Sequence, residues 1–504
     1  MKKSQIFKTL MLVAATLGSV ACLTACSDDD EITGSQTTEP KVYTMTVHAT
    51  KGGNATTRAL SLSDDGKTLY GKWKEGEDVG VFREYEKDDW RIIGHLTATN
   101  ISADGLRCTL TGTFEADYVA FGGGLEVGDQ LKLQLGDDVE WRFVDQNGSL
   151  ECLSDNYDTN VAIVTVGEVS TATAGDKTVY SITTTGPATF EPQYAIVRFN
   201  FQDKSGRPIS AYNVFSYELL EYDLNIAPSS TSVYMAVNAK TYSKISFRVV
   251  GYVDGKSITG QGDFYEYSRS GVTFEKGKFY DISVKMNRRV WLPYFESDFT
   301  AQEGDIFEKG LFEDHNVIIP DGVTVTLRNI WINEENTITN GTHAGITCLG
   351  DATIILDGTS VVRSFGSGYP AIKPGGLGST LTIKGSGRLQ AYGGDHATAI
   401  GGSSNLSCGN ILICGGTVEA TGGTGAPAIG NYGINSCGTI TIDNTVARVT
   451  ATKGSGADNS IGFAGTSFGS CGRVTIGGTV YWDGLAYQNG GEAYLATSPL
   501  TYQP

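Results

Sequence analysis

The sequence predicts an all-β protein in which two tandem β-sandwiches precede a right-handed parallel β-helix of about six coils. The main observation is a repeat between Gly322 and Gly478, in which six short apolar segments recur with gaps of 29, 27, 30, 29 and 34 residues. Self-similarity at a nearly fixed period of this size is typical of solenoids. The segments alternate with period two and are separated by Gly-Gly pairs, which favours strands over helices.

Each repeat is expected to form one coil, with one apolar anchor residue pointing into the core. The six anchors are Leu327, Leu356, Ile383, Ile413, Ile442 and Ile476. A second inward column follows at Ile346, Ile372, Ile400, Ile429 and Ile461. Coils should stack about 4.8 Å apart, and because one coil cannot bury its own apolar face, neighbouring coils must stabilise one another.

Composition limits the classes of partner. The net charge of −18 argues against nucleic acid, which needs clustered Lys and Arg, and against docking by charge on anionic lipid. The chain has 65 Gly and only 12 Pro, together with many Thr, Val and Tyr, as expected of an all-β protein. After the first 25 residues no segment is long and apolar enough to span a membrane.

Residues 1–25 have the plan of a secretory signal, with Lys2 and Lys3 before an apolar run. The run ends in Leu-Thr-Ala-Cys at Cys26, which resembles a bacterial lipobox. The resemblance implies cleavage before Cys26 and acylation of that residue; the alternative is an ordinary cleavage site with an incidental cysteine. Residues 26–40 form a polar, flexible linker. Its Ser-Asp-Asp-Asp-Glu start resembles the signal that sends lipoproteins of Bacteroidetes-type cells to the outer face of the outer membrane.

Residues 41–289 alternate apolar and polar residues in short runs bounded by turn residues, which predicts strands. Several short strands at such spacing favour β-sandwiches, one over 41–170 and one over 171–289. The break between them is placed near residue 170, in the Ser/Thr/Ala/Gly stretch that ends at Gly175. The predicted β-helix then occupies residues 290–504.

The stretch TTRALSLSDDGKTLYGKWKEGEDVGVF, which contains Trp73 and Gly76, resembles the opening of fimbrillin-like pilins and adhesins. The segments Tyr194 to Phe201 and Phe274 to Met286 resemble the core strand and the closing strand of the second sandwich of that family. The resemblance covers about half of the chain. It implies a surface-exposed adhesin or fimbrial subunit that assembles with other fimbrial subunits.

In fimbrillin-like proteins, subunits can be trimmed after an arginine before they polymerise by strand donation. Arg58, followed by Ala59, matches such a position, although a single arginine in a loop is a weak signal. An ordinary shaft subunit of the family ends after its second sandwich. The appended repeat therefore favours a tip or stand-alone adhesin, with a structural pilus component lacking its own ligand as an alternative.

Three cysteines share one phase of the repeat. Cys408, Cys437 and Cys471 each lie five residues before an anchor, so they should stack as a ladder. Adjacent rungs are close enough for a disulfide, but three cysteines cannot all pair. The sequence contains no spacing typical of a metal site, so a buried column of thiols is favoured, and no metal or other cofactor is expected.

An enzyme is the minority interpretation. Polysaccharide lyases and hydrolases share the β-helix architecture, but a hydrolase needs two carboxylates at a fixed separation and a lyase needs an acidic calcium cluster beside a base. The acidic residues of the repeat fall at differing phases of the coil and should not converge. We therefore assign no catalytic residue.

Binding is better supported. Tyr369, Tyr392 and Tyr432 occupy corners of consecutive coils beside Gly-rich turns, and His396 lies in the same part of the repeat. Aromatic faces stack on sugar rings while nearby polar groups fix orientation; the alternative is that the rings only cover corner glycines. The sequence thus predicts a lipid-anchored outer-membrane adhesin that binds a glycan or a host or bacterial surface protein.

Overall fold

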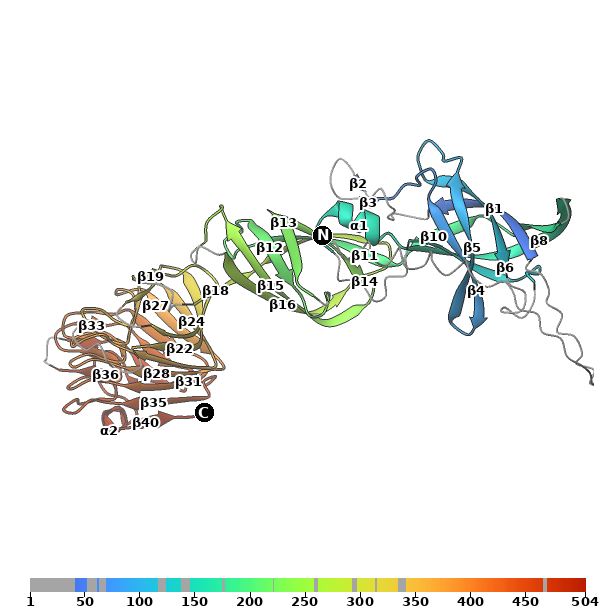
Figure 1. Ribbon diagram of the computed structural model, residues 1–504. Helices are drawn as coiled ribbons and strands as arrows, with labels where there is room; N and C mark the ends of the chain where they lie inside the picture. Colours follow the sequence, from blue (N-terminus) through green and yellow to red (C-terminus); the bar gives the residue numbers. More distant parts are fainter. Residues whose placement is uncertain are drawn as a thin grey trace, which may run out of the picture.

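A computed structural model of the chain describes residues 41–51, 61–62, 69–116, 124–136, 146–174, 177–220, 222–257, 262–291, 297–312, 315–333, 341–465 and 469–504. In these residues the protein is built from strands, with two short helices, α1 (Leu150–Asn156) and α2 (Gly491–Ala496). The predicted all-β class is confirmed. Figure 1 shows three β-rich units in chain order, drawn from blue through green to red.

The first unit is one eight-stranded sheet that closes on itself. Its strands are β1 (Lys41–Lys51), β4 (Asp78–Glu86), β5 (Asp89–Thr99), β6 (Arg107–Ala116), β7 (Gln130–Leu135), β8 (Asn160–Ala174), β9 (Lys177–Thr184) and β10 (Ala188–Pro192). Strand β1 pairs with β6 on one side and with β9 and β10 on the other. This arrangement differs from the expected sandwich, because the same sheet curls round instead of two sheets facing each other. A separate two-stranded pair joins β2 (Ser61–Leu62) and β3 (Leu69–Tyr70).

The first unit also extends further along the chain than residue 170. The Ser/Thr/Ala stretch is the second half of strand β8, which pairs antiparallel with β9 through Ala174. Threonine and valine suit an exposed strand as well as a loop, so composition alone suggested a linker. Because β10 still belongs to this sheet, the boundary between the units lies near Gln193.

The second unit packs two sheets face to face. One sheet is β14 (Ser232–Asn238), β11 (Tyr194–Gln202) and β17 (Phe279–Lys285); the other contains β12 (Ile209–Phe215), β13 (Leu224–Ser230), β15 (Thr241–Val253) and β16 (Asp263–Thr273). Phe199 and Phe201 of β11 meet Phe247 of β15 in edge-to-face contacts at 4.8 and 5.4 Å between ring centroids. These buried rings hold the two sheets together.

The third unit is a stack of coils built from three sheets of parallel strands, here called the coil stack. The first sheet contains β20 (Asp305–Phe312), β22 (Val323–Ile332), β24 (Ala352–Asp357), β27 (Thr380–Gly385), β30 (Asn410–Ile413), β34 (Ile440–Ile442) and β38 (Val474–Ile476). The second continues from the end of β22 through β25 (Thr359–Arg363), β28 (Arg388–Tyr392), β31 (Thr417–Thr421) and β35 (Arg448–Thr452). The third is β19 (Phe299–Thr300), β21 (Val317–Ile319), β23 (Ile346–Cys348), β26 (Ile372–Lys373), β29 (Ile400–Gly401), β32 (Ile429–Tyr432) and β36 (Ile461–Ala464).

The register of the first sheet corrects two of the predicted anchors. Ile383, Ile413, Ile442 and Ile476 stack as expected, but the residues beneath Ile383 are Ile354 and Val325. Leu356 pairs with Leu327 on one side and with Gly385 on the other. Both leucines are nevertheless buried, because a shift of two residues returns a strand side chain to the same face.

The second predicted column is present as expected, from Ile346 through Ile372, Ile400 and Ile429 to Ile461. The parallel stacking begins earlier than Gly322, because β20 lies beneath β22 and Val317 of β21 lies beneath Ile346. At the other end β39 (Thr479–Trp482) and β40 (Leu500–Tyr502) pair antiparallel with β38 and β35. These antiparallel strands and α2 close the stack.

Strand β18 (Asn287–Val290) joins the second unit to the coil stack. It pairs antiparallel with β16 and parallel with β20, so one sheet runs without a break from the second unit into the coils. The boundary predicted at residues 289 and 290 therefore falls inside a hydrogen-bonded strand. Met286 belongs to the core of the second unit, and Val290 belongs to the core of the coil stack.

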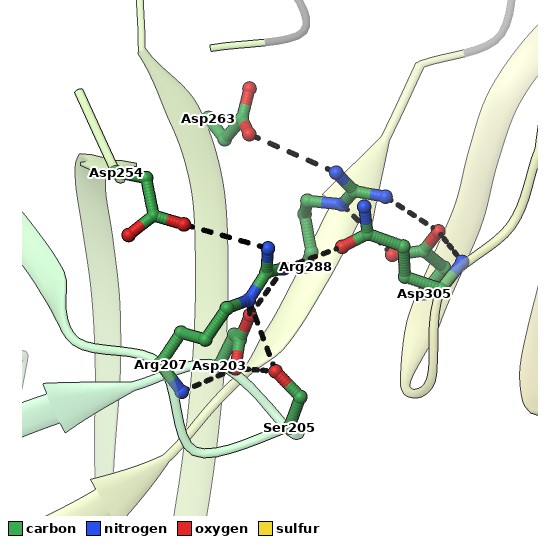
Figure 2. A network of polar contacts seen from close by, with 8 residues as sticks. Asp203, Ser205, Arg207, Asp254, Asp263, Arg288 and Asp305 are labelled. Carbon is green, nitrogen blue, oxygen red and sulfur yellow. Dashed lines mark hydrogen bonds and ion pairs between the residues drawn. The ribbon is translucent and has the colours of Figure 1, made fainter. Parts of the chain in front are cut away.

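A buried ion pair lies on this junction (Figure 2). The Arg288 guanidinium donates to both oxygens of Asp305, at 2.9 and 2.8 Å, and lies 4.0 Å from Asp263. The side chains of Arg288 and Asp305 are 8% and 0% exposed. Burial raises the pKa of Asp305, and the Arg288 guanidinium opposes that rise. The carboxylate is further held by the backbone N–H of Gln302, so both charges are paired across the junction.

We predict that removing one partner of this pair is costly. Arg288→Ala leaves the Asp305 carboxylate buried without its cation and should lower the free energy of unfolding by about 3–5 kcal/mol. The double variant Arg288→Met/Asp305→Leu should be more stable than Arg288→Ala, because it removes both charges. Chemical denaturation of the three proteins measures this. A double variant less stable than the single variant would contradict the assignment.

We also predict a strong difference between two neighbouring residues of β30. Ile413 is fully buried and Leu412 points outward, half-buried. Ile413→Asp puts a carboxylate into the dry column and should cost several kcal/mol of stability, whereas Leu412→Thr should be mild. Equal losses of melting temperature in the two variants would show that this register is wrong.

Candidate functional site

A hollow of the coil stack lies at the corner that follows the second parallel sheet; we call it the corner site. Its volume is about 290 Å³. Three consecutive coils contribute polar side chains and a ring to it, namely Arg363, Ser364, Ser367, Tyr392, Asp395 and Thr421. Four glycines line the rest of the hollow. The site is therefore built from stacked turns, not from one loop.

Tyr392 and Arg363 form one wall of the corner site. Each is the last residue of its strand, and the register places Arg363, Tyr392 and Thr421 side by side on successive coils. The Arg363 guanidinium carbon lies 3.7 Å from the centroid of the Tyr392 ring. This cation–π contact orients the ring and places a positive charge at the edge of the hollow.

Asp395 and His396 form the next part of the corner. The Asp395 carboxylate accepts a hydrogen bond from the Thr424 hydroxyl of the following coil at 2.9 Å. The His396 ring stacks on the Tyr432 ring, with 5.5 Å between centroids and an interplanar angle of 21°. His396 has a positive φ of 59°, a backbone conformation that is uncommon outside glycine.

The four predicted ligand residues thus gather at one corner, in different surroundings. Tyr392 lines the hollow, and His396 follows Asp395, which also lines it. Tyr432 packs over Gly425, where an added Cβ would meet its ring at 3.1 Å, so this tyrosine also covers a corner glycine. Tyr369 touches the corner through its backbone, as its carbonyl accepts from the Gly394 N–H at 3.1 Å.

The glycines of the corner are required by close backbone stacking. A Cβ on Gly394 would lie 2.1 Å from the Gly366 carbonyl oxygen, and one on Gly423 would lie 1.8 Å from that of Gly394. No other residue fits such an approach without displacing the backbone. The Gly-Gly pairs that follow β28 and β31 therefore mark this corner in the sequence. The positions of the tyrosines alone did not locate it.

The outer face of the second sheet carries a charged ladder next to the corner, which sequence reasoning missed. Glu419 lies between Arg388 and Arg448, with N–O distances of 2.5 and 3.2 Å, and it also accepts from the Gln390 amide. The hydrogen bond from Arg388 lowers the pKa of Glu419. Because the pattern needs the register of three strands, spacing along the chain could not show it.

The acidic side chains of the coils are engaged separately. Asp351 accepts from the Thr380 N–H, Asp357 pairs with Arg328 at 2.7 Å, and Asp443 accepts from Thr445. Asp351 and Asp357 thus bind groups of a neighbouring coil, whereas Asp443 stabilises its own turn. In the described part of the chain no group of three or more His, Cys, Asp and Glu side chains is arranged to hold a metal ion.

Some predicted sites cannot be placed. Cys26, Arg58 and Ala59 lie outside the described residues, as do the signal and the acidic linker. Among the residues that are described, neither helix is long and apolar enough to cross a membrane.

No protein-family model matches the chain, and no curated protein matches it. Several solved structures share features with it. A provisionally assigned cell adhesion protein from Parabacteroides distasonis matches with a TM-score of 0.24 and 10% identity, over 48% of this chain and 92% of that one. A tip fimbrial protein from Porphyromonas gingivalis, with a C-terminal truncation, matches with a TM-score of 0.25 and 7% identity, over 48% and 95%. A fimbrial protein from Bacteroides ovatus matches with a TM-score of 0.21 and 12% identity, over 49% of this chain and 48% of that one.

These neighbours are named for cell adhesion or fimbriae, and each match covers about half of this chain. Their TM-scores and identities are too low to assign a family or a function to this chain.

Proposed function

We propose that this chain is a surface adhesin or tip-like fimbrial subunit of fimbrillin-like type, in which a right-handed parallel β-helix binds a glycan. The observation that carries the proposal is the corner site, where a half-buried tyrosine ring, hydroxyl groups and a carboxylate from consecutive coils surround one hollow. Sugar-binding sites combine an aromatic surface with a few convergent polar groups in the same way. On this proposal the first two units act as the stalk.

The geometry of the coils suits an extended ligand. Tyr392 and Thr421 sit in register on neighbouring strands, and the next strand adds Thr452 to the same row. Neighbouring residues within this row are about 4.8 Å apart, which is close to the length of one hexose residue. A sugar chain lying across the strands would therefore meet Tyr392, Thr421 and Thr452 at about one coil per sugar residue.

The proposal includes attachment to the outer membrane by acylation of Cys26 and display on the outer face through the acidic linker. It leaves room for assembly with other fimbrial subunits, for which cleavage between Arg58 and Ala59 would be the maturation step. A glycan, or a host or bacterial surface protein, is the external partner. No cofactor is needed for adhesion of this kind.

A structural pilus component without its own ligand is the second candidate. The contact of Tyr432 with Gly425 and the cover of Arg363 over Tyr392 favour it, because both rings have packing roles. A polysaccharide lyase or hydrolase is less well supported, because the carboxylates described above are engaged one by one. An enzyme would also alter the glycan that it binds.

We predict that Tyr392→Ala weakens glycan binding about five-fold, corresponding to about 1 kcal/mol for one ring–sugar contact. The full chain is applied to an array of neutral and acidic polysaccharides, and the affinity for any glycan bound is then measured by calorimetry. Tyr392→Phe keeps the ring and should bind nearly as well. Tyr217→Ala removes a tyrosine that is 82% exposed on the second unit and should leave binding unchanged.

The structural alternative gives the opposite pattern in the same experiment. Tyr392→Ala would then lower the melting temperature while the wild-type chain binds no glycan on the array. That outcome would end the carbohydrate proposal and leave protein-mediated adhesion or a structural role. Shortening of the glycan during incubation would instead support an enzyme.

We further predict that Cys26→Ala abolishes acylation and releases the chain from membranes, because a lipid on this residue is the proposed membrane attachment. Metabolic labelling with a fatty-acid analogue and membrane fractionation measure this. Replacing Asp28, Asp29 and Asp30 by Ala is the matched control: labelling should persist while protease access on whole cells falls. Equal labelling of wild type and Cys26→Ala would exclude the anchor.

A further inference from the structure

The three cysteines of the ladder stack as their spacing predicts. The backbone of Cys408 forms a parallel β-bridge with that of Cys437. Cys437 is in turn the backbone register partner of Cys471, where β33 (Ser436–Cys437) pairs in parallel with β37 (Ser470–Cys471). All three are buried, with exposed fractions of 0%, 4% and 4%. The thiols therefore lie in one line across three coils, away from the corner site.

Cys437 and Cys471 are in direct contact through their sulfur atoms. The Sγ atoms of Cys437 and Cys471 are 3.0 Å apart as free thiols. In-register parallel strands place Cα atoms about 4.8 Å apart, inside the range of roughly 4.4–6.8 Å that disulfides require. The backbone is thus already in position, and only the side chains need to turn.

Cys408 and Cys471 both contact a backbone carbonyl oxygen but differ in their access to a cavity. The Cys408 Sγ contacts the Gly430 carbonyl oxygen at 3.6 Å, and its side chain is fully buried. Cys471 instead borders a cavity of about 160 Å³ at the end of the coil stack, together with Asn459, Phe463, Trp482 and Tyr487. That volume exceeds the share of about 30 Å³ that one molecule occupies in liquid water, so a molecule as small as a peroxide fits beside Cys471.

The hydrogen bonding of the ladder also favours a nucleophile at its centre. Hydrogen bonding with Cys408, and then with Cys471, lowers the pKa of the Cys437 thiol, while the pKa of Cys471 is raised. The thiolate is the reactive form in disulfide chemistry. Of the two thiols in contact, Cys437 therefore loses its proton more readily, while Cys471 is the one that borders the cavity.

We propose that Cys437 and Cys471 are an oxidation site that forms a disulfide rung between the last coils, with a small peroxide as oxidant, while Cys408 remains a thiol. One sulfur attacks the O–O bond, takes one oxygen as a sulfenic acid and releases hydroxide. The second sulfur attacks the sulfenic sulfur, forms the S–S bond and releases a second hydroxide. With the two thiol protons both leave as water, so the thiols lose two electrons and the peroxide gains two.

The rung would add a covalent link between coils that backbone pairing and a hydrogen bond between the Ser436 and Ser470 hydroxyls, at 2.9 Å, hold at this edge. The sheet of β33 and β37 has two strands, and the Trp482 indole of the closing segment donates to the Cys471 carbonyl at 3.0 Å. A covalent link here restricts the unfolded chain across the loop between residues 437 and 471. Oxidation should therefore stabilise the end of the stack.

The test uses the full chain, first reduced and then treated with hydrogen peroxide. Thiols are alkylated in denaturant, and the protein is cut with trypsin and a glutamate-specific protease. Cleavage after Glu419 and Arg448 separates the peptide of Cys437 from that of Cys408, so mass spectrometry can assign the pair. We expect one linked pair, Cys437 with Cys471, two fewer alkylated thiols, and a melting temperature raised by at least about 2 °C that dithiothreitol reverses.

Two matched variants complete the test. Cys408→Ser should still form the link, and Cys471→Ser should not. A link between Cys408 and Cys437 in the wild-type chain, or full alkylation of all three ladder cysteines after peroxide, would overturn the proposal. Because wild type and Cys408→Ser decide the matter by themselves, a failure of Cys471→Ser to fold would not obscure the result.

Discussion

Backbone pairing in parallel register between successive coils is the interaction on which the rest of this structure depends. It fixes the distance between coils at about 4.8 Å and brings equivalent residues of each repeat into contact. The isoleucine columns, the Arg388–Glu419–Arg448 ladder and the cysteine ladder all follow from it. The corner site follows as well, because the strand register places Arg363, Tyr392 and Thr421 next to one another.

The same pairing extends beyond the coils. Strand β18 continues the coil sheet into the second unit, and the buried pair of Arg288 and Asp305 lies on that continuation. Separating a buried ion pair leaves two unpaired charges and costs free energy. The pair therefore opposes movement of the second unit away from the first coil. The first coil is thereby joined to the second unit both by a continuous sheet and by a buried ion pair.

The corner combines tightly stacked glycine turns with aromatic and charged side chains. The backbone turns approach so closely that only glycine fits at Gly394 and Gly423, and Gly394 also lines the hollow. Aromatic and charged side chains from the strand ends then surround it. Tyr432 covers a glycine and stacks on His396, while Tyr392 faces the hollow under Arg363. Neighbouring tyrosines thus have different surroundings: Tyr432 packs on the turn, and Tyr392 lines the hollow.

The sequence by itself determined the all-β class, the repeat and its inward columns, because alternation and period are local properties that survive without knowledge of the fold. It also placed Cys408, Cys437 and Cys471 in one ladder from a constant offset. Register was decided only by the tertiary structure: the 27-residue gap between Leu356 and Ile383 concealed that Ile354 lies beneath Ile383. The closed first sheet, the boundary near Gln193 and the Arg288–Asp305 junction likewise depend on pairings between distant strands. The alternation within a strand shows which of its side chains are buried. Which strand it pairs with, and in which register, depends on the whole fold and cannot be read from the local sequence.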